Sequence, residues 1–413
     1  MEKHRFCARQ INAPIAADTN IIVIIPCYNE PELLKTLQSL FECEKTFFPA
    51  EVIVVINSGE HVGQDVIEHN KKTFHDTNEW IKNQQHEKLL FQLISIDNLP
   101  KKHAGVGLAR KIGMDEAVAR FDDISKSDGV IVCLDADCTV EKNYLTEIEK
   151  HFQQHPKTTG CSIYYEHPID GTEFSKKIYD GIINYELFLR YYNRSLHFCK
   201  FPYSFHTIGS SMAVRNIIYQ KQGGMNRRKA GEDFYFLHKI FPLGNFTELN
   251  TTKVIPSPRE SDRVPFGTGN AMQKILAADS QIYLTYNFQT FIDLKTFFIN
   301  IPNFFSPSTN QNIISTLPAS IQTFLSENNF EEKLTELKKH SASEKMFVKR
   351  FFNWFDGFMI LKFVHFVRDN FYERQEITEA ANQLLQVTNN SFGKINSKKE
   401  LLIYFREIER KKI

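Results

Sequence analysis

Two aspartates, Asp135 and Asp137, directly follow a short apolar run at residues 130–134. Such a run is typical of a buried strand, and side chains two positions apart at its end point to the same side. Ligands of open α/β sheets bind beyond the carboxyl ends of the strands. Two carboxylates at that place suit a divalent cation such as Mg²⁺ or Mn²⁺, which prefers oxygen ligands. A solvated turn is the alternative interpretation, so the surrounding elements decide between the two.

Alternating apolar and amphipathic segments predict the framework that holds this pair. Continuous apolar runs predict strands at residues 21–26, 52–56, 89–96 and 130–134. Helical periodicity predicts helices at residues 32–41 and 104–119, and a further helix at 234–240. Buried strands alternating with helices predict an α/β fold with a mainly parallel sheet and helices on both faces.

The residue composition and periodicity of the chain change twice, which predicts its division into domains. Aromatic residues crowd residues 164–205, and past residue 270 the pattern is helical with breaks rich in Asn, Ser and Pro. We expect an N-terminal extension over residues 1–20, an α/β domain over 21–270 and a helical C-terminal region over 271–413.

Composition excludes several classes of protein. The 50 Lys and Arg residues balance 49 Asp and Glu residues, and this net charge of +1 gives no reason to expect nucleic acid as a partner. The seven cysteines show no C-x-x-C pair, which argues against a disulfide framework or a zinc site. Residues 1–20 do not resemble a signal peptide, and no apolar run reaches the ~18 residues of a membrane span. We therefore expect a cytoplasmic protein.

Two common nucleotide-binding motifs fail in this sequence. The run Gly105-Val106-Gly107 begins like a dinucleotide fingerprint, but Arg110 stands where the third glycine is needed for close helix packing. No G-x-x-x-x-G-K-[ST] sequence occurs, so a P-loop is absent. A nucleotide pocket would therefore be built from loop ends, with the aspartate pair supplying the metal ligands.

Four short elements occur in an order that resembles glycosyltransferase family 2 enzymes of the GT-A fold. They are Pro26-Cys27-Tyr28-Asn29-Glu30, Ala109-Arg110-Lys111-Ile112-Gly113, Leu134-Asp135-Ala136-Asp137 and Ala230-Gly231-Glu232-Asp233. Two departures accompany the resemblance. Lys111 replaces the usual Asn, and the second strand ends in Asn57-Ser58-Gly59 instead of an Asp-Asp-x-Ser sequence.

The resemblance implies a metal-dependent transfer of a sugar from a nucleotide-diphosphate sugar to an acceptor hydroxyl, with inversion at the anomeric carbon. It implies Asp137 as the direct ligand of Mg²⁺ or Mn²⁺, with Asp135 reaching the ribose, the metal or a metal-bound water. It implies Asp233 as the general base. The residues expected to bind the nucleotide sugar are Pro26, Tyr28, Glu30, Asn57, Arg110, Asp135, Glu232, Arg259 and Arg263.

Two of these assignments have simpler alternatives. A carboxylate such as Asp233 at the start of a helix also satisfies free N–H groups, so capping is its structural alternative. Arg259 and Arg263 fall in a Pro- and Gly-rich loop that could close over a diphosphate. They could instead pair with Glu260 and Asp262 at the surface.

The acceptor is expected to be a carbohydrate or a lipid-linked molecule. Aromatic residues between 164 and 205 could stack on sugar rings, but such residues usually form core. The Phe-rich segment 346–367, interleaved with basic residues, could lie on the inner face of a membrane. A helix packing its apolar face onto the protein is the alternative.

Two other functions remain open at this point. A sugar-phosphate nucleotidyltransferase also uses an α/β domain and a divalent cation, but the Gly-rich triphosphate loop that it needs is missing after the first strand. A non-catalytic carbohydrate-binding or scaffold protein could retain the fold, and the altered turn at Asn57 is compatible with this alternative. Asp135, Asp137 and Asp233 argue against such a protein.

Overall fold

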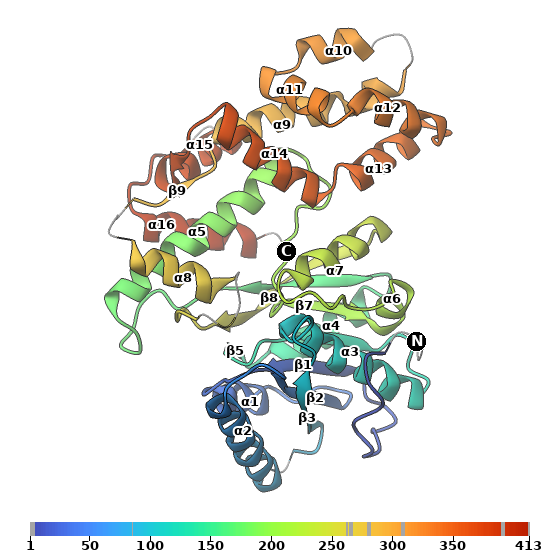
Figure 1. Ribbon diagram of the computed structural model, residues 1–413, viewed down its shortest axis with the longest axis vertical. Coiled ribbons are helices and arrows are strands. Elements are labelled where there is room, and N and C mark those ends of the chain that lie inside the picture. Colours follow the sequence, from blue (N-terminus) through green and yellow to red (C-terminus); the bar gives the residue numbers. More distant parts are fainter. Residues whose placement is uncertain are drawn as a thin grey trace. The chain divides into compact units, whose positions relative to one another are not determined.

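The computed structural model describes residues 5–84, 86–261, 263, 267–278, 282–306, 310–389 and 393–411. The chain divides into two compact units (Figure 1). Unit 1 consists of Met1–Tyr179, Thr207–Ala277 and Glu409–Ile413, and unit 2 consists of Asp180–His206 and Ala278–Ile408. The expected domain boundaries at residues 20 and 270 stay a prediction.

Among the described residues of unit 1, an eight-stranded sheet forms the centre, in the order β3-β2-β1-β4-β7-β6-β8-β5. Strands β3, β2, β1 and β4 run parallel to one another. In the other half, β7 is antiparallel to β4 and β6, β6 is parallel to β8, and β5 is antiparallel to β8. The strands are β1 Ile21–Cys27, β2 Ala50–Gly59, β3 Leu89–Leu99, β4 Val130–Cys133, β5 Cys138–Val140, β6 Gly160–Tyr165, β7 Met212–Arg215 and β8 Phe246–Pro256.

The central strands show why the apolar runs form a sheet of this kind. Every residue of β1 and β2 is buried, so both faces of these strands are covered. Ile24 of β1 lies opposite Ile53 of β2 and Cys133 of β4, which places the carboxyl ends of the three strands at one edge. The expected α/β fold with a mainly parallel sheet is confirmed.

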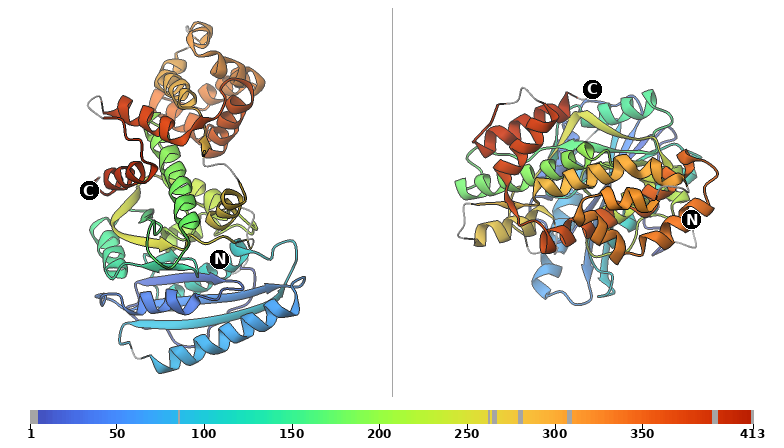
Figure 2. Two further views of the ribbon diagram at one scale, coloured as in Figure 1. Left: turned by 90° about the vertical axis from the view of Figure 1, so that its left-hand side faces the viewer. Right: turned by 90° about the horizontal axis from the view of Figure 1, so that it is seen from above.

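Helices cover this sheet (Figure 2), and α3 packs against β1 and β2. A Cβ at Gly113 of α3 would overlap the side chain of Ile24, so a glycine at that position lets the helix approach β1. The helices are α1 Leu33–Phe41, α2 Gln64–Asn83, α3 Val106–Asp123, α4 Tyr144–Gln154, α6 Asn216–Lys221, α7 Glu232–Ile240, the 3-10 turn η2 Phe241–Leu243 and α8 Thr268–Ala277.

Unit 2 is helical and has an aromatic core. The Phe297 ring lies 5.6 Å from the Phe351 ring and 6.0 Å from the Phe330 ring, measured between centroids. Its elements are most of α5 Lys176–Phe198, β9 Leu284–Thr285, α9 Phe288–Asn300, η3 Ile301–Phe305, α10 Asn310–Thr316, α11 Ala319–Glu327, α12 Phe330–Lys339, α13 Glu344–Trp354, α14 Gly357–Asn370, β10 Gln375–Glu376, α15 Ile377–Thr388 and most of α16 Lys398–Arg410. The expected helical C-terminal region is confirmed.

The Phe-rich segment 346–367 contributes its apolar side to this core. Phe347 and Phe351 of α13 and Phe363 of α14 are fully buried, whereas Met346 and Phe358 remain 43% and 51% exposed. Within the described part of the chain, no helix is both long and apolar enough to cross a bilayer.

Candidate active site

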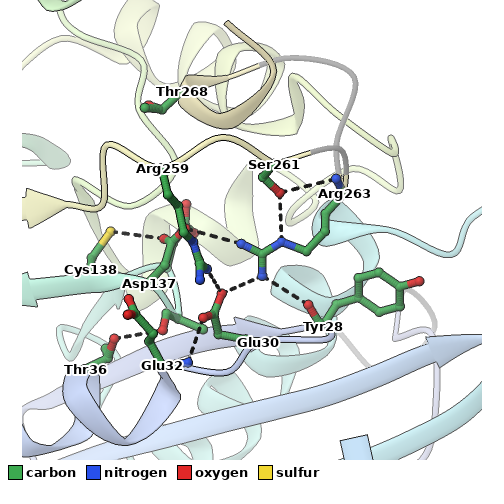
Figure 3. A network of polar contacts seen from close by, with 12 residues as sticks. Tyr28, Glu30, Glu32, Thr36, Asp137, Cys138, Arg259, Ser261, Arg263 and Thr268 are labelled. Atoms are coloured by element: carbon green, nitrogen blue, oxygen red, sulfur yellow. Dashed lines mark hydrogen bonds and ion pairs between the residues drawn. The ribbon is translucent and has the colours of Figure 1, made fainter. Parts of the chain in front are cut away.

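Loops at the carboxyl ends of β1 and β4 bring two acidic elements together. Glu30 follows β1, and Asp135 and Asp137 follow β4. Because these strands are parallel neighbours, the loops leave the sheet on the same side. Figure 3 shows Glu30 and Asp137 side by side, with the loop that follows β8 above them.

Arg259 and Arg263 of the β8–α8 loop hold this side of the site together. Both guanidinium groups pair with the carboxylate of Glu30, whose side chain is only 1% exposed. Both also reach Oδ2 of Asp137, at 3.5 Å from Arg259 and 3.4 Å from Arg263 (Figure 3). Arg263 Nη1 donates to the backbone carbonyl of Tyr28 at 3.2 Å as well.

The two arginines thus point toward Glu30 and Asp137, and their contact with a diphosphate stays a prediction. Among the residues that the structure describes, no ion pair joins either arginine to Glu260. Asp262 and residues 264–266 of the same loop lie outside the described residues. The alternative pairing with Glu260 is therefore not observed.

Arg110 bridges the Asp-x-Asp element and the Glu-Asp element. It lies near the start of α3 with its side chain 2% exposed. Its Nη2 donates to Oδ1 of Asp135 at 2.6 Å, and its Nη1 donates to the buried carboxylate of Glu232. A Cβ at Gly209 would come within 2.8 Å of both terminal nitrogens of Arg110, so the missing side chain at position 209 leaves room for the guanidinium.

Asp233 lies in the first turn of α7, next to this bridge. The helix begins at Glu232, and its N-cap is Gly231 with φ of +67°, a conformation that glycine adopts without strain. Oδ1 of Asp233 accepts a hydrogen bond from the backbone N–H of Phe234 at 2.7 Å. One carboxylate oxygen of Asp233 therefore accepts a hydrogen bond from the first turn of the helix, as the capping alternative requires. The other oxygen takes no part in that bond.

Burial raises the pKa of Asp233, and the nearby Asp135 carboxylate raises it further. The Arg110 charge and the backbone N–H groups of Phe234 and Gly209 oppose this rise. Burial also raises the pKa of Asp137 to about 6, with the Asp135 and Glu30 carboxylates adding to it and the two loop arginines opposing it. The arginines thus compensate the negative charge only in part, both around Asp137 and around Asp233.

The residues at Asp137 fit a divalent cation that arrives with a phosphate ligand. Five carboxylates, those of Glu30, Asp135, Asp137, Glu232 and Asp233, face the three guanidinium groups of Arg110, Arg259 and Arg263. Two negative charges are left over when all are ionised. In the described part of the chain, no three His, Cys, Asp or Glu side chains gather as a metal cage. Mg²⁺ typically binds through one or two carboxylates plus substrate phosphates, so the aspartate pair suffices.

Orphan polar atoms at the same place also indicate a ligand. Within the described residues, the buried Nε of Arg259 and Oγ of Ser257 find no hydrogen-bond partner. A pocket of about 160 Å³ lies against Asp137, Ser257 and Thr36.

The end of β2 lies beside these loops, and two polar residues there escaped the sequence analysis. Asn70 of α2 donates to the backbone carbonyl of Asn57 at 3.0 Å and accepts from the N–H of Asn29 at 3.0 Å. Asp97 of β3 accepts from the Ser58 hydroxyl at 2.7 Å. A carboxylate is thus present next to the altered turn, supplied by the neighbouring strand. Pro26 lies near the end of β1, opposite Val55 of β2.

Residues 22–223 match the profile of glycosyl transferase family 2. This segment is therefore a family 2 glycosyltransferase domain, and the expected family and enzyme class are confirmed for it.

The chain is also similar to solved structures. One is S. aureus TarS 1–349 in complex with UDP-GlcNAc, with a TM-score of 0.41 and 15% identity, over 81% of this chain and 91% of that one. Another is GalNAc-T7 with UDP, GalNAc and Mn²⁺, with a TM-score of 0.39 and 13% identity, over 77% and 57% of the two chains. No curated protein shows significant similarity to this sequence.

Proposed function

We propose that this glycosyltransferase moves a sugar from a nucleotide-diphosphate sugar to an acceptor hydroxyl with the help of Mg²⁺ or Mn²⁺, and inverts the anomeric carbon. The observation that carries the proposal is the Arg110 bridge. By pairing with both Asp135 and Glu232, Arg110 brings the nucleotide side of the site next to Asp233.

On the donor side, we assign Asp137 and Asp135 as metal ligands and Arg259 and Arg263 as ligands of the diphosphate. A bound divalent cation would neutralise charge that develops on the departing diphosphate. The guanidinium groups match phosphate oxygens in shape and charge, and Glu30 holds them beside Asp137 until the donor competes for them.

On the acceptor side, we assign Asp233 as the general base that takes the proton of the attacking hydroxyl. Its raised pKa makes it a stronger base than an exposed aspartate. Glu232 is engaged by Arg110, which supports a positioning role through that arginine.

At the nucleotide end, we assign Pro26, Tyr28, Asn57 and Asp97 to the base and ribose. Asn57 offers a donor and an acceptor, and Asp97 supplies the carboxylate that the second strand lacks. Assays of D97N with a panel of donors that carry different bases would show whether Asp97 contributes to base selection.

A donor screen tests the proposal. The wild-type protein is mixed with nucleotide-diphosphate sugars, with Mn²⁺ or with EDTA, and its melting temperature and the release of nucleotide diphosphate are measured. We expect one donor to raise the melting temperature and to be hydrolysed only with the metal. Stabilisation by a nucleoside triphosphate with a sugar phosphate would favour a nucleotidyltransferase, and no effect of any donor would favour a scaffold protein. The anomeric configuration of the product, read by NMR, tests inversion.

We keep contact of unit 2 with the inner face of a membrane as a prediction. The exposed Met346 and Phe358, next to Lys345 and Lys362, support it. Co-sedimentation with vesicles, compared between the wild type and M346Q/F358Q, tests it.

A further inference from the structure

Two loops rich in basic residues precede, in the sequence, the helices that carry Arg110 and Asp233. The loop before α3 contains Lys101, Lys102 and His103, and the loop before α7 contains Arg227, Arg228 and Lys229. Residues 98–105 and 222–231 contain no Asp or Glu, although the charges of the whole chain nearly cancel. We call these six residues the basic surface.

The two loops are in contact where they lead into α3 and α7. A Cβ on Gly105 would lie 3.1 Å from Cα of Lys229. A Cβ on Gly107 would overlap the backbone oxygen of Arg228 and lie 2.9 Å from Cβ of Glu232. The loop before α7 therefore rests on the first turn of α3, and the basic surface ends at the residues that precede Asp233.

Aromatic rings, not carboxylates, hold the two arginines. The guanidinium carbon of Arg228 lies 3.6 Å from the ring centre of Tyr235, and that of Arg227 lies 5.3 Å from the ring centre of Phe6. A guanidinium group that lies over a ring keeps its in-plane N–H donors available for an oxyanion.

Nearby carboxylates are engaged elsewhere. Glu60 accepts from the backbone N–H of Lys101 at 3.0 Å, Asp97 accepts from Ser58, and Glu232 pairs with Arg110. Across the described residues, none of the six basic side chains forms an ion pair with a carboxylate. Lys101, Lys102 and the three residues 227–229 are exposed. Glu60 thus lies beside Lys101, whereas Arg227, Arg228 and Lys229 keep an uncompensated positive charge among the described residues.

The N-terminal segment fixes Phe6 in place. Arg5 pairs with Glu116 of α3 at 2.9 Å, and the backbone N–H of Ile11 donates to the same carboxylate at 3.2 Å. Arg9 pairs with Asp123 at the end of α3. These contacts tie residues 5–11 to α3 and set the Phe6 ring beside Arg227.

We infer that the acceptor is an anionic glycan or polymer, bearing phosphate or carboxylate groups, that lies along the basic surface when its hydroxyl meets Asp233. This inference rests on the proposed function, because it names the chemical class of that acceptor. We have assigned the donor diphosphate to Arg259 and Arg263, whereas the basic surface adjoins the helix start that carries Asp233.

Binding of inorganic polyphosphate to matched variants tests the inference. The test variant is R227Q/R228Q/K229Q, and the control is K71Q/K72Q/K82Q, which removes the same charge from exposed positions of α2. We expect the test variant to bind polyphosphate at least tenfold more weakly than the wild type and with a shallower salt dependence, because fewer counterions are released. The control should bind like the wild type, and neutral dextran should bind to none of them.

Equal affinities of the test variant and the control would overturn the inference. So would a wild type that binds phosphatidylglycerol vesicles through these residues and ignores polyphosphate, because the surface would then be a membrane site. The donor screen is run on the same variants, and its melting shifts should be unchanged. Absence of any donor effect in the wild type would instead refute the proposed function, whatever the polyphosphate result.

Substitutions of Phe6 give a second test, whose expected result differs from that of a folding defect. F6L removes the ring from Arg227, and an exposed cation–π contact of about 0.5–1 kcal/mol corresponds to roughly a two- to fivefold loss of polyphosphate affinity. F6Y should restore wild-type binding. If F6L and F6Y behave alike, the ring does not position Arg227.

Discussion

Replacing Asp137 by Asn should stabilise the protein while abolishing its activity. The folded structure raises the pKa of Asp137 from 3.8 to about 6, mainly through burial. Ionising this group is therefore harder in the folded chain than in the unfolded chain. Asn keeps the shape of the side chain and removes the charge.

The shift of roughly two pKa units corresponds to about 3 kcal/mol at 1.36 kcal/mol per unit. The side chain is 27% exposed, so solvent reduces this penalty. We expect D137N to gain about 1–2 kcal/mol at pH 7.5, which raises the melting temperature by about 1–4 °C.

The pH dependence follows from the direction of the shift. A carboxylate with a raised folded-state pKa loses stability as pH rises from its unfolded pKa through its folded pKa. The advantage of D137N should therefore be absent below pH 4, grow between pH 4 and about 6, and stay constant above that range.

Calorimetry of the wild type and D137N at pH 4 and pH 7.5, without donor or metal, measures this difference. D128N is the control, because Asp128 is 64% exposed and its contact with Lys126 is long at 3.4 Å. With donor and Mn²⁺ the order should reverse, since a ligand at a hundred times its Kd stabilises the wild type by about 2.7 kcal/mol. The reasoning would be refuted if D137N melted at a lower temperature than the wild type at pH 7.5. It would also be refuted if the difference in melting temperature were the same at both pH values.

Three further predictions concern other residues of the site. D233N should lower kcat by about 10²- to 10⁴-fold with donor affinity retained, as titration calorimetry and product release would show; near-normal turnover would remove Asp233 as the base. R110A should cost about 3–5 kcal/mol of stability in urea unfolding, because it leaves the buried Glu232 carboxylate unpaired, and a cost below 1 kcal/mol would contradict the bridge. E30Q should weaken donor binding about tenfold, since Arg259 and Arg263 lose the carboxylate that holds them beside Asp137; an unchanged Kd would show that Glu30 does not position them.

The sequence predicted the parallel half of the sheet because burial on both faces demands unbroken apolar runs. Residues 21–26 fall on β1, residues 130–134 cover β4 and the residue after it, and Asp135 and Asp137 follow at the expected edge. The start of α7 was placed two residues late. Gly231 ends the preceding loop in a left-handed conformation, so the helix takes in Glu232 and Asp233.

Contacts between distant segments could not be predicted from local patterns. Glu30 and Arg259 are separated by 229 positions, and no spacing rule joins them. The same holds for Asn70 and Asp97, which fill roles at the β2 end only because α2 and β3 lie beside it. The ring contact between Phe6 and Arg227 also depends on the folded chain, through the docking of residues 5–11 on α3.

The most direct test of the account is a comparison of donor binding and turnover in the wild type, D137N and D233N. Titration calorimetry with the donor from the screen, in Mn²⁺, is run beside an assay for released nucleotide diphosphate. We predict that the wild type binds and releases, that D233N binds with wild-type affinity and turns over at least about a hundredfold more slowly, and that D137N does not bind. Metal-dependent binding by D137N equal to that of the wild type, or full turnover by D233N, would contradict the division of roles between the two aspartates.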